Sequence, residues 1–222
     1  MKQMKISIVL QTIYAYIKTR LGGYVRPKRY TQIFDEIQKT KPKNIMEVGT
    51  WKGTHAKEMI AFAARYNNIS TIKYFGFDLF ETMTKDVYVH EVSKMPPREK
   101  DVREYIESSG AKITLYAGYT ENTLRTQDHL PQMDFVFIDG GHSASTVLND
   151  WNSVQKTMHK NTTVIFDDYW HNRTDGPKVV IDAIDKGKFN VEILPIVDVF
   201  FNPDFGRLVI SLVKVTLKYN FL

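Results

Sequence analysis

The chain has 222 residues, of which 43% are hydrophobic and 13% aromatic, enough to bury one core of good size. It contains no cysteine, which excludes a disulfide framework, a thiolate nucleophile and a cysteine-based zinc site. A reducing compartment is compatible with this composition, and we expect a cytoplasmic protein. The 30 basic and 25 acidic side chains give a net charge of +5, spread along the chain, which favours an ordinary solvated surface over a nucleic-acid-binding patch.

The sequence divides into a predicted helical lid or appendage, residues 1–40, and a main domain, residues 41–222. An apolar run over residues 6–17 follows two lysines and superficially resembles a secretory signal, but polar residues interrupt it and no small-residue cleavage pattern follows. It is shorter than the roughly 20 residues that span a membrane, so we predict no transmembrane segment. Its apolar residues share one helical face, which predicts a packed or lid helix, with a membrane-surface anchor as the alternative.

Residues 44–53, Asn-Ile-Met-Glu-Val-Gly-Thr-Trp-Lys-Gly, read as a short buried strand, a two-glycine turn and the start of a helix. Gly49 lets the chain turn sharply, and Gly53 lets a ligand approach the helix N-terminus, where unpaired N–H groups favour a carboxylate. Glu47 stands at the strand end, where a negative charge repels a pyrophosphate but suits a cationic amine. An amino-acid head group carries both an amine and a carboxylate, so these residues indicate S-adenosylmethionine.

Strands and helices alternate along the rest of the domain. Runs typical of buried strands cover residues 74–80, 113–117, 133–138 and 162–166. Helical patterns cover residues 56–63, 97–109 and 177–187, and a further helix carries Val147, Leu148, Trp151, Val154 and Met158 on one side. This alternation predicts an α/β fold, a parallel sheet with helices on both faces. The last two runs, residues 191–201 and 207–215, leave no room for a helix between them and predict an antiparallel hairpin.

The motifs at the strand ends resemble those of the class I S-adenosylmethionine-dependent methyltransferases, most closely the metal-dependent small-molecule O-methyltransferases of the macrocin and catechol types. This resemblance implies a Rossmann-like, seven-stranded mixed sheet whose last strand is antiparallel. It also implies methyl transfer to a hydroxyl group of a small-molecule acceptor. The matching pieces, in chain order, are Glu-Val-Gly-Thr-Trp-Lys-Gly at 47–53, Phe-Gly-Phe-Asp at 75–78, Ala-Gly-Tyr-Thr at 117–120, Phe-Ile-Asp-Gly-Gly-His at 137–142 and Ile-Phe-Asp-Asp-Tyr at 165–169.

The same resemblance implies where the cofactor binds. Asp78 would accept hydrogen bonds from the ribose hydroxyls, as an acidic residue does after the second strand of dinucleotide-binding folds; the alternative is an ordinary loop-capping aspartate. Thr120, or Tyr119 beside it, would lie near the adenine, and Asp139 would border the cofactor. The residues that would hold the methionine end are Glu47, Gly49, Thr50, Trp51 and Gly53.

Three carboxylates follow two predicted strands: Asp139 ends the fourth, and Asp167 and Asp168 end the fifth. Adjacent strands lie about 4.8 Å apart, so these side chains can converge at one edge of the sheet. Three like charges together favour a divalent cation, and hard oxygen ligands suit magnesium, with calcium or manganese possible. The alternative is that Asp139 only caps the next helix and that one of the tandem pair points to solvent.

His142, three residues after Asp139, is the candidate general base that would deprotonate the acceptor hydroxyl, because an imidazole titrates near neutral pH. It could instead cap a helix or support a metal ligand. Tyr169, Trp170 and His171 could form an aromatic wall for the acceptor, or could be ordinary packing.

Two other functions stay open at this point. A nucleic-acid methyltransferase would account for the pI of 9.1, but the Asn-Pro-Pro-aromatic motif of many base methyltransferases is replaced by Asp-Gly-Gly-His, so nucleic acid is not the expected partner. A non-catalytic ligand-binding module of the same fold is the third reading.

Overall fold

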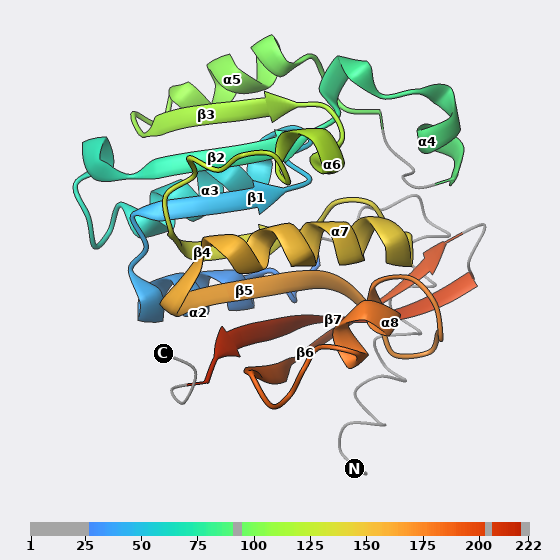
Figure 1. Ribbon diagram of the computed structural model, residues 1–222. Helices are drawn as coiled ribbons and strands as arrows, with labels where there is room; N and C mark the ends of the chain where they lie inside the picture. The colour runs from blue at the N-terminus through green and yellow to red at the C-terminus, as the bar shows by residue number, and fades with distance from the viewer. Residues whose placement is uncertain (1–26, 91–94, 203–205, 219–222) are drawn as a thin grey trace.

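The computed structural model describes residues 27–90, 95–202 and 206–218. They form a seven-stranded mixed sheet in the order β3-β2-β1-β4-β5-β7-β6, with helices on both faces (Figure 1). The strands are β1 (Asn44–Val48), β2 (Lys73–Asp78), β3 (Lys112–Ala117), β4 (Met133–Ile138), β5 (Met158–Trp170), β6 (Phe189–Asn202) and β7 (Gly206–Leu217). The helices are α2 (Thr31–Thr40), α3 (Thr54–Ala63), α4 (Lys85–His90), α5 (Glu99–Glu107), α6 (Thr120–Thr123), α7 (Ala144–Val154) and α8 (Pro177–Asp182), with single 3-10 turns at Ile69–Thr71, Phe80–Thr82 and Gln155–Thr157.

The sheet is parallel from β3 to β5, and only β7 runs against its neighbours. The carboxyl ends of β1, β2, β4 and β5 therefore meet at one edge, which we call the rim. The strand order reverses beside β1, whose neighbours are β2 on one side and β4 on the other. Open α/β sheets bind ligands in the crevice at such a switch point. The predicted fold class, including the C-terminal antiparallel hairpin, is confirmed.

Each face of the sheet packs its own apolar layer, because side chains alternate between the faces along every strand. In β1, Ile45 packs with α2, α3 and α5, whereas Met46 packs with α7 and α8 on the opposite face. Figure 1 shows α6, α7 and α8 in front of the sheet and α2 and α3 behind it. The strands are thus covered on both sides, which is why they read as continuous apolar runs in the sequence.

Several predicted boundaries were wrong. The helix predicted over residues 97–109 spans only Glu99–Glu107. The helix after β4 ends at Val154, and Met158, which was placed on it, begins β5 instead; Leu148 is 48% exposed. The helix that starts at Pro177 ends at Asp182 instead of continuing to residue 187. β5 runs to Trp170, beyond the predicted end at Phe166, because it continues through an irregularity in its pairing with β7.

The helix predicted over residues 6–17 lies outside the described residues. The last part of the predicted appendage, Thr31–Thr40, is α2, and its residues Ile33 and Ile37 are buried against the sheet with α3. Among the described residues, no helix has the length and apolar character needed to cross a membrane.

Candidate active site

The loop after β1 lies directly against the loop after β4, and Gly49 makes this close approach possible. Gly49 has φ +93°, and a Cβ atom on it would lie 2.0 Å from the carbonyl oxygen of Asp139. The backbone N–H of Asp139 donates to the carbonyl of Val48 at 2.8 Å, which ties the two loops together at the switch point. Only glycine fits this position, because other residues rarely adopt this φ and have no room here.

Helix α3 begins at the rim with no capping side chain on its N-cap residue, Gly53. Gly53 has φ +73°, and a Cβ atom on it would lie 2.6 Å from Ile106 of α5. The first N–H groups of a helix have no partner within the helix and carry its positive dipole end. The loop from Gly49 to Gly53 therefore presents a helix N-terminus of the kind that accepts a carboxylate.

Glu47 lies under this loop and is completely buried. The hydroxyl of Tyr74 donates a hydrogen bond to Glu47 Oε2, and Thr50 Oγ1 lies 3.3 Å from the same hydroxyl. Glu47 Oε1 has no hydrogen-bond partner among the described residues. Burial raises the pKa of Glu47 to about 8, against the hydrogen bond from Tyr74, which lowers it. A buried carboxylate with one oxygen still to be paired fits a cationic amine.

Asp78, at the end of β2, already serves the backbone of the loops around it. Its Oδ2 accepts from the N–H of Trp51 at 2.6 Å, and its Oδ1 accepts from the N–H of Phe80 at 3.1 Å. Both of these residues have positive φ, +44° and +46°, a conformation that costs a residue with a side chain roughly 1–2 kcal/mol. The N–H of Leu79 is a third backbone donor to this carboxylate. The loop-capping role is therefore present, and because a carboxylate offers about four lone-pair positions, Asp78 keeps room for a ribose hydroxyl.

Thr120 is the first residue of α6, at the carboxyl end of β3. Its Oγ1 accepts a hydrogen bond from Asn149 of α7 at 3.1 Å. Tyr119 precedes it and is 44% exposed. Thr120 is thus tied to α7, and the adenine contact predicted for Thr120 or Tyr119 stays a prediction.

Asp139, Asp167 and Asp168 come together at the rim as their strand ends predicted, with carboxylate oxygens within 4.8 Å of one another. The pairing of β5 with β7 shifts between Phe166 and Tyr169, and Asp168 has φ +55°. This bulge brings both tandem residues to the cluster, although adjacent residues of a regular strand point to opposite faces. Burial raises the pKa of Asp139 well above its usual range, and the charges of Asp167 and Asp168 raise it further.

Arg29, which sequence reasoning missed, lies against Asp167 and Asp168 of this cluster and is only 4% exposed. Its Nε donates to Asp167 Oδ1 at 2.7 Å and its Nη2 donates to Asp167 Oδ2 at 2.8 Å. The hydroxyl of Tyr30 donates to the same Oδ2 at 2.7 Å. Burial lowers the pKa of Arg29, but the neighbouring carboxylates raise it more, so it stays charged. Nothing in the local sequence distinguishes Arg29 from the other basic residues around it.

The fit of a divalent metal to the three carboxylates depends on Asp167. Its Oδ1 also accepts from the N–H of Asp168 at 2.7 Å, so each of its oxygens has two donors. A carboxylate offers about four lone-pair positions, and those of Asp167 are filled. Asp167 therefore does not fit as a metal ligand in this arrangement, and the predicted magnesium site stays a prediction.

His142 reaches Asp168 from the loop before α7. Its Nε2 lies 2.7 Å from Asp168 Oδ2. Burial raises the pKa of Asp168, but the hydrogen bond and charge of His142 and the charge of Arg29 outweigh it and hold the pKa below the usual value. His142 is not the helix cap: Ser143 caps α7 by accepting the N–H of Thr146 at 3.2 Å. In this pair, the ionised carboxylate of Asp168 can orient the imidazole of His142.

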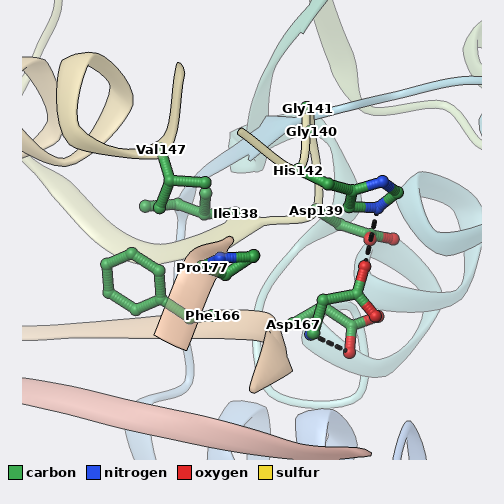
Figure 2. A pocket seen from close by; sticks show the side chains of 10 residues that line it. Ile138, Asp139, Gly140, Gly141, His142, Val147, Phe166, Asp167 and Pro177 are labelled. Atoms are coloured by element: carbon green, nitrogen blue, oxygen red, sulfur yellow. Dashed lines mark hydrogen bonds and ion pairs between the residues drawn. The ribbon is translucent and has the colours of Figure 1, made fainter. Parts of the chain in front are cut away.

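A small pocket separates the polar and apolar sides of the rim (Figure 2). His142, Asp139 and Asp167 lie on one side of it, opposite Val147 and Phe166. Its volume is about 10 Å³, the room of a single water molecule. Tyr169 and Trp170 are 7% and 6% exposed and belong to packed apolar clusters, which favours the packing interpretation over an aromatic wall.

Comparisons with solved structures give the same architecture at low sequence identity. A putative O-methyltransferase from Klebsiella pneumoniae is 15% identical and has a TM-score of 0.58, covering 93% of this chain and 89% of its own. An O-methyltransferase from Bacillus cereus in complex with SAH is 16% identical with a TM-score of 0.59, covering 88% and 83%. A putative rRNA-methylase from Clostridium thermocellum is 11% identical with a TM-score of 0.57, covering 88% and 100%. At these identities the likeness shows the fold.

Among curated proteins, the uncharacterized protein R132 of Acanthamoeba polyphaga mimivirus is 33% identical over 73 residues, which are 32% of this chain. The match spans about a third of that protein, 33% of its length. A family model described as a methyltransferase domain matches residues 46–169, more than half of the chain and the part that contains the rim from β1 to β5. The chain therefore belongs to this family of methyltransferase domains.

Proposed function

We propose that this protein transfers a methyl group from S-adenosylmethionine to a hydroxyl group of a small molecule. The observation that carries the proposal is Glu47, a fully buried carboxylate with one unpaired oxygen beneath the glycine loop. An amine fits this oxygen, and the N-terminus of α3 fits the carboxylate of the same amino-acid head group. A pyrophosphate has no positive charge with which to stabilise ionised Glu47, so a dinucleotide fits less well.

The remaining contacts follow from the rim. Asp78 would accept the ribose hydroxyls with its remaining lone pairs, and Thr120 would lie beside the adenine. Gly49, Thr50 and Trp51 would place the loop backbone along the methionine moiety, with Gly53 at the start of α3. Asp139, from the opposite loop, would border the other side. The Bacillus cereus O-methyltransferase of the same fold is in complex with SAH, which supports the choice of cofactor.

When bound, the cofactor supplies an electrophilic methyl group on a sulfonium. The chain's own contribution is to position the acceptor and to take its proton. Holding two reactants in attack geometry can lower a barrier by about 7–11 kcal/mol. A neutral His142 that donates from Nε2 to Asp168 carries its lone pair on Nδ1, which would receive the proton of the acceptor hydroxyl. Asp168 would hold the ring in that tautomer and stabilise the imidazolium that forms.

Isothermal titration calorimetry tests the first part of this proposal. The ligands are S-adenosylmethionine and its demethylated product, S-adenosylhomocysteine (SAH). Wild-type protein is expected to bind both, and Glu47→Gln to bind at least about tenfold more weakly, since a lost charge-assisted hydrogen bond is worth about 1.5–3 kcal/mol. Glu107→Gln, in an exposed residue of α5, is the matched control and should bind like the wild type. No binding to the wild type at millimolar ligand would end the proposal.

Acceptor screening tests the second part. Transfer of a labelled methyl group to hydroxylated small molecules supports the proposal. Labelling of RNA or DNA in a salt-sensitive manner would instead indicate a nucleic-acid methyltransferase. Tight SAH binding without methyl transfer to any class of acceptor would indicate a non-catalytic ligand-binding module of the same fold.

A further inference from the structure

The guanidinium of Arg29 lies against Asp167 and Asp168 of the carboxylate cluster and also faces Asp198, although its Nη1 has no hydrogen-bond partner among the described residues. Asp167 binds it through two parallel hydrogen bonds of 2.7 and 2.8 Å. Its Nη2 lies 3.8 Å from Asp168 Oδ1 and its Nη1 lies 3.5 Å from Asp198 Oδ2. Three carboxylates thus surround one cation, in the way that acidic side chains surround a bound metal ion.

The backbone holds Arg29 at this position independently of its side chain. Asp198 of β6 accepts the N–H groups of Lys28 at 3.0 Å and of Arg29 at 2.8 Å. The guanidinium carbon lies 4.4 Å from the centre of the Tyr30 ring and 5.5 Å from that of Phe200. The side chain is therefore packed between two rings and anchored at its base, so its position is built into the fold.

The presence of Arg29 changes what the cluster can bind. Because both oxygens of Asp167 already accept two hydrogen bonds each, a metal ion could use Asp167 only after Arg29 and Tyr30 moved away. A bidentate arginine–carboxylate pair that is buried is costly to break, since each charge would be left uncompensated. If Asp168 binds no metal ion, its carboxylate can orient His142.

We infer that Arg29 is the resident cation of the rim, in the position where a divalent metal ion would neutralise Asp139, Asp167 and Asp168, and that the site works without a metal. The methyl-transfer part of this inference rests on the proposed function, but the cation site itself does not. Arg29 is a positioning residue: it holds Asp167 directly and balances the charge next to the His142–Asp168 pair.

Titration with Mn²⁺, followed by electron paramagnetic resonance, tests the cation site without any methyl acceptor. The wild-type protein is expected to bind no Mn²⁺ at the rim at millimolar concentration. Arg29→Ala removes the guanidinium and leaves the carboxylates uncompensated, so it should bind one Mn²⁺ ion. That binding should disappear in the double variant Arg29→Ala, Asp139→Asn. Arg29→Lys, which keeps the charge, is the matched control and should bind none.

The inference is overturned if the wild type binds one Mn²⁺ ion that Asp139→Asn abolishes. It is also overturned if Arg29→Ala keeps its circular dichroism spectrum yet binds no Mn²⁺. If Arg29→Ala does not fold, the wild-type titration decides alone.

SAH titration, with and without a chelator, separates the two proposals. If the wild type does not bind SAH, the proposed function is contradicted, but the inference about the cation site is not. Metal-dependent transfer by the wild type removes the inference and not the function.

Discussion

The hydroxyl of Tyr74 donates a hydrogen bond to the carboxylate of Glu47, and both side chains are completely buried beneath the glycine loop. One oxygen of this carboxylate is left without a partner among the described residues. The unpaired buried oxygen therefore lowers the stability of the ligand-free protein, and the same oxygen can accept a hydrogen bond from a cation. Both the stability of the protein and its binding of a cationic ligand should depend on pH for this reason.

The first prediction concerns stability. The pKa of Glu47 is 4.5 in an unfolded chain, and burial raises this pKa to about 8 in the folded protein. Between these values the folded state binds more protons, so its stability should fall as pH rises, by up to about 1.4 kcal/mol per pH unit, and level off above the folded pKa. Denaturant unfolding of the wild type and of Glu47→Gln over this range measures the difference. A difference that does not change with pH would contradict the assignment.

Proton release on binding is the second prediction. A cationic amine stabilises ionised Glu47 and lowers its pKa, so SAH binding should release protons at pH values between 4.5 and about 8. Titration calorimetry in two buffers of different ionisation enthalpy measures the number released, on the acid side of this window where the amine is already charged. Glu47→Gln should abolish the release, whereas equal apparent enthalpies for the wild type would count against an amine contact.

Gly49→Ala tests the contact between the two rim loops. Its Cβ atom would lie 2.0 Å from the carbonyl oxygen of Asp139, so the loops must move apart. We expect a loss of about 2–4 kcal/mol in the free energy of unfolding, from the left-handed conformation together with overpacking, and a marked loss of SAH affinity.

Gly206→Ala is the matched control for this substitution. Gly206 has φ +70°, yet a Cβ atom added there would have no neighbour within 4 Å among the residues that the structure describes, so the conformational cost is the one expected there. A cost of about 1 kcal/mol is expected. Equal losses for Gly49→Ala and Gly206→Ala would show that the close approach of the two rim loops contributes nothing to the free energy of unfolding.

Asp168→Asn tests the pair formed with His142. The amide can orient the ring but cannot stabilise an imidazolium, so kcat should fall by about 10²–10⁴-fold with little change in SAH affinity. His142→Ala should lower kcat similarly, and the double variant should be no slower than the worse single variant, because residues that act as one unit are not additive. Additive losses would separate the two residues into independent roles.

Much of the rim could be predicted from the sequence, because its features are local. Apolar runs that end in Glu47, Asp78, Asp139 and Asp167 indicate parallel strands whose acidic ends meet at one edge. Gly49 and Gly53 indicate the turn and the helix start by their residue type. The hairpin of β6 and β7 follows from the lack of residues for a connecting helix.

The contacts that were missed join distant parts of the chain. Arg29 and Asp167 are separated by 138 positions, and Arg29 and Asp198 by 169. No periodicity or motif relates such residues before the fold is known. The bulge at Asp168 is also invisible, because aspartate does not indicate a positive φ as clearly as glycine does. The ends of α5 and α8 also lie inside the predicted ranges, at Glu107 and Asp182.

The link between Arg29 and Asp167 affects how the protein can be shortened. A truncation at the predicted boundary before residue 41 would keep every strand and every motif of the methyltransferase domain. It would also remove the only positive charge within 4 Å of Asp167 in the described chain, together with the packing of Ile33 and Ile37 on the sheet. Such a minimal domain should assemble its sheet poorly and carry repelling acids at its edge, so we expect that a working shortened protein has to include the segment that begins at Arg29.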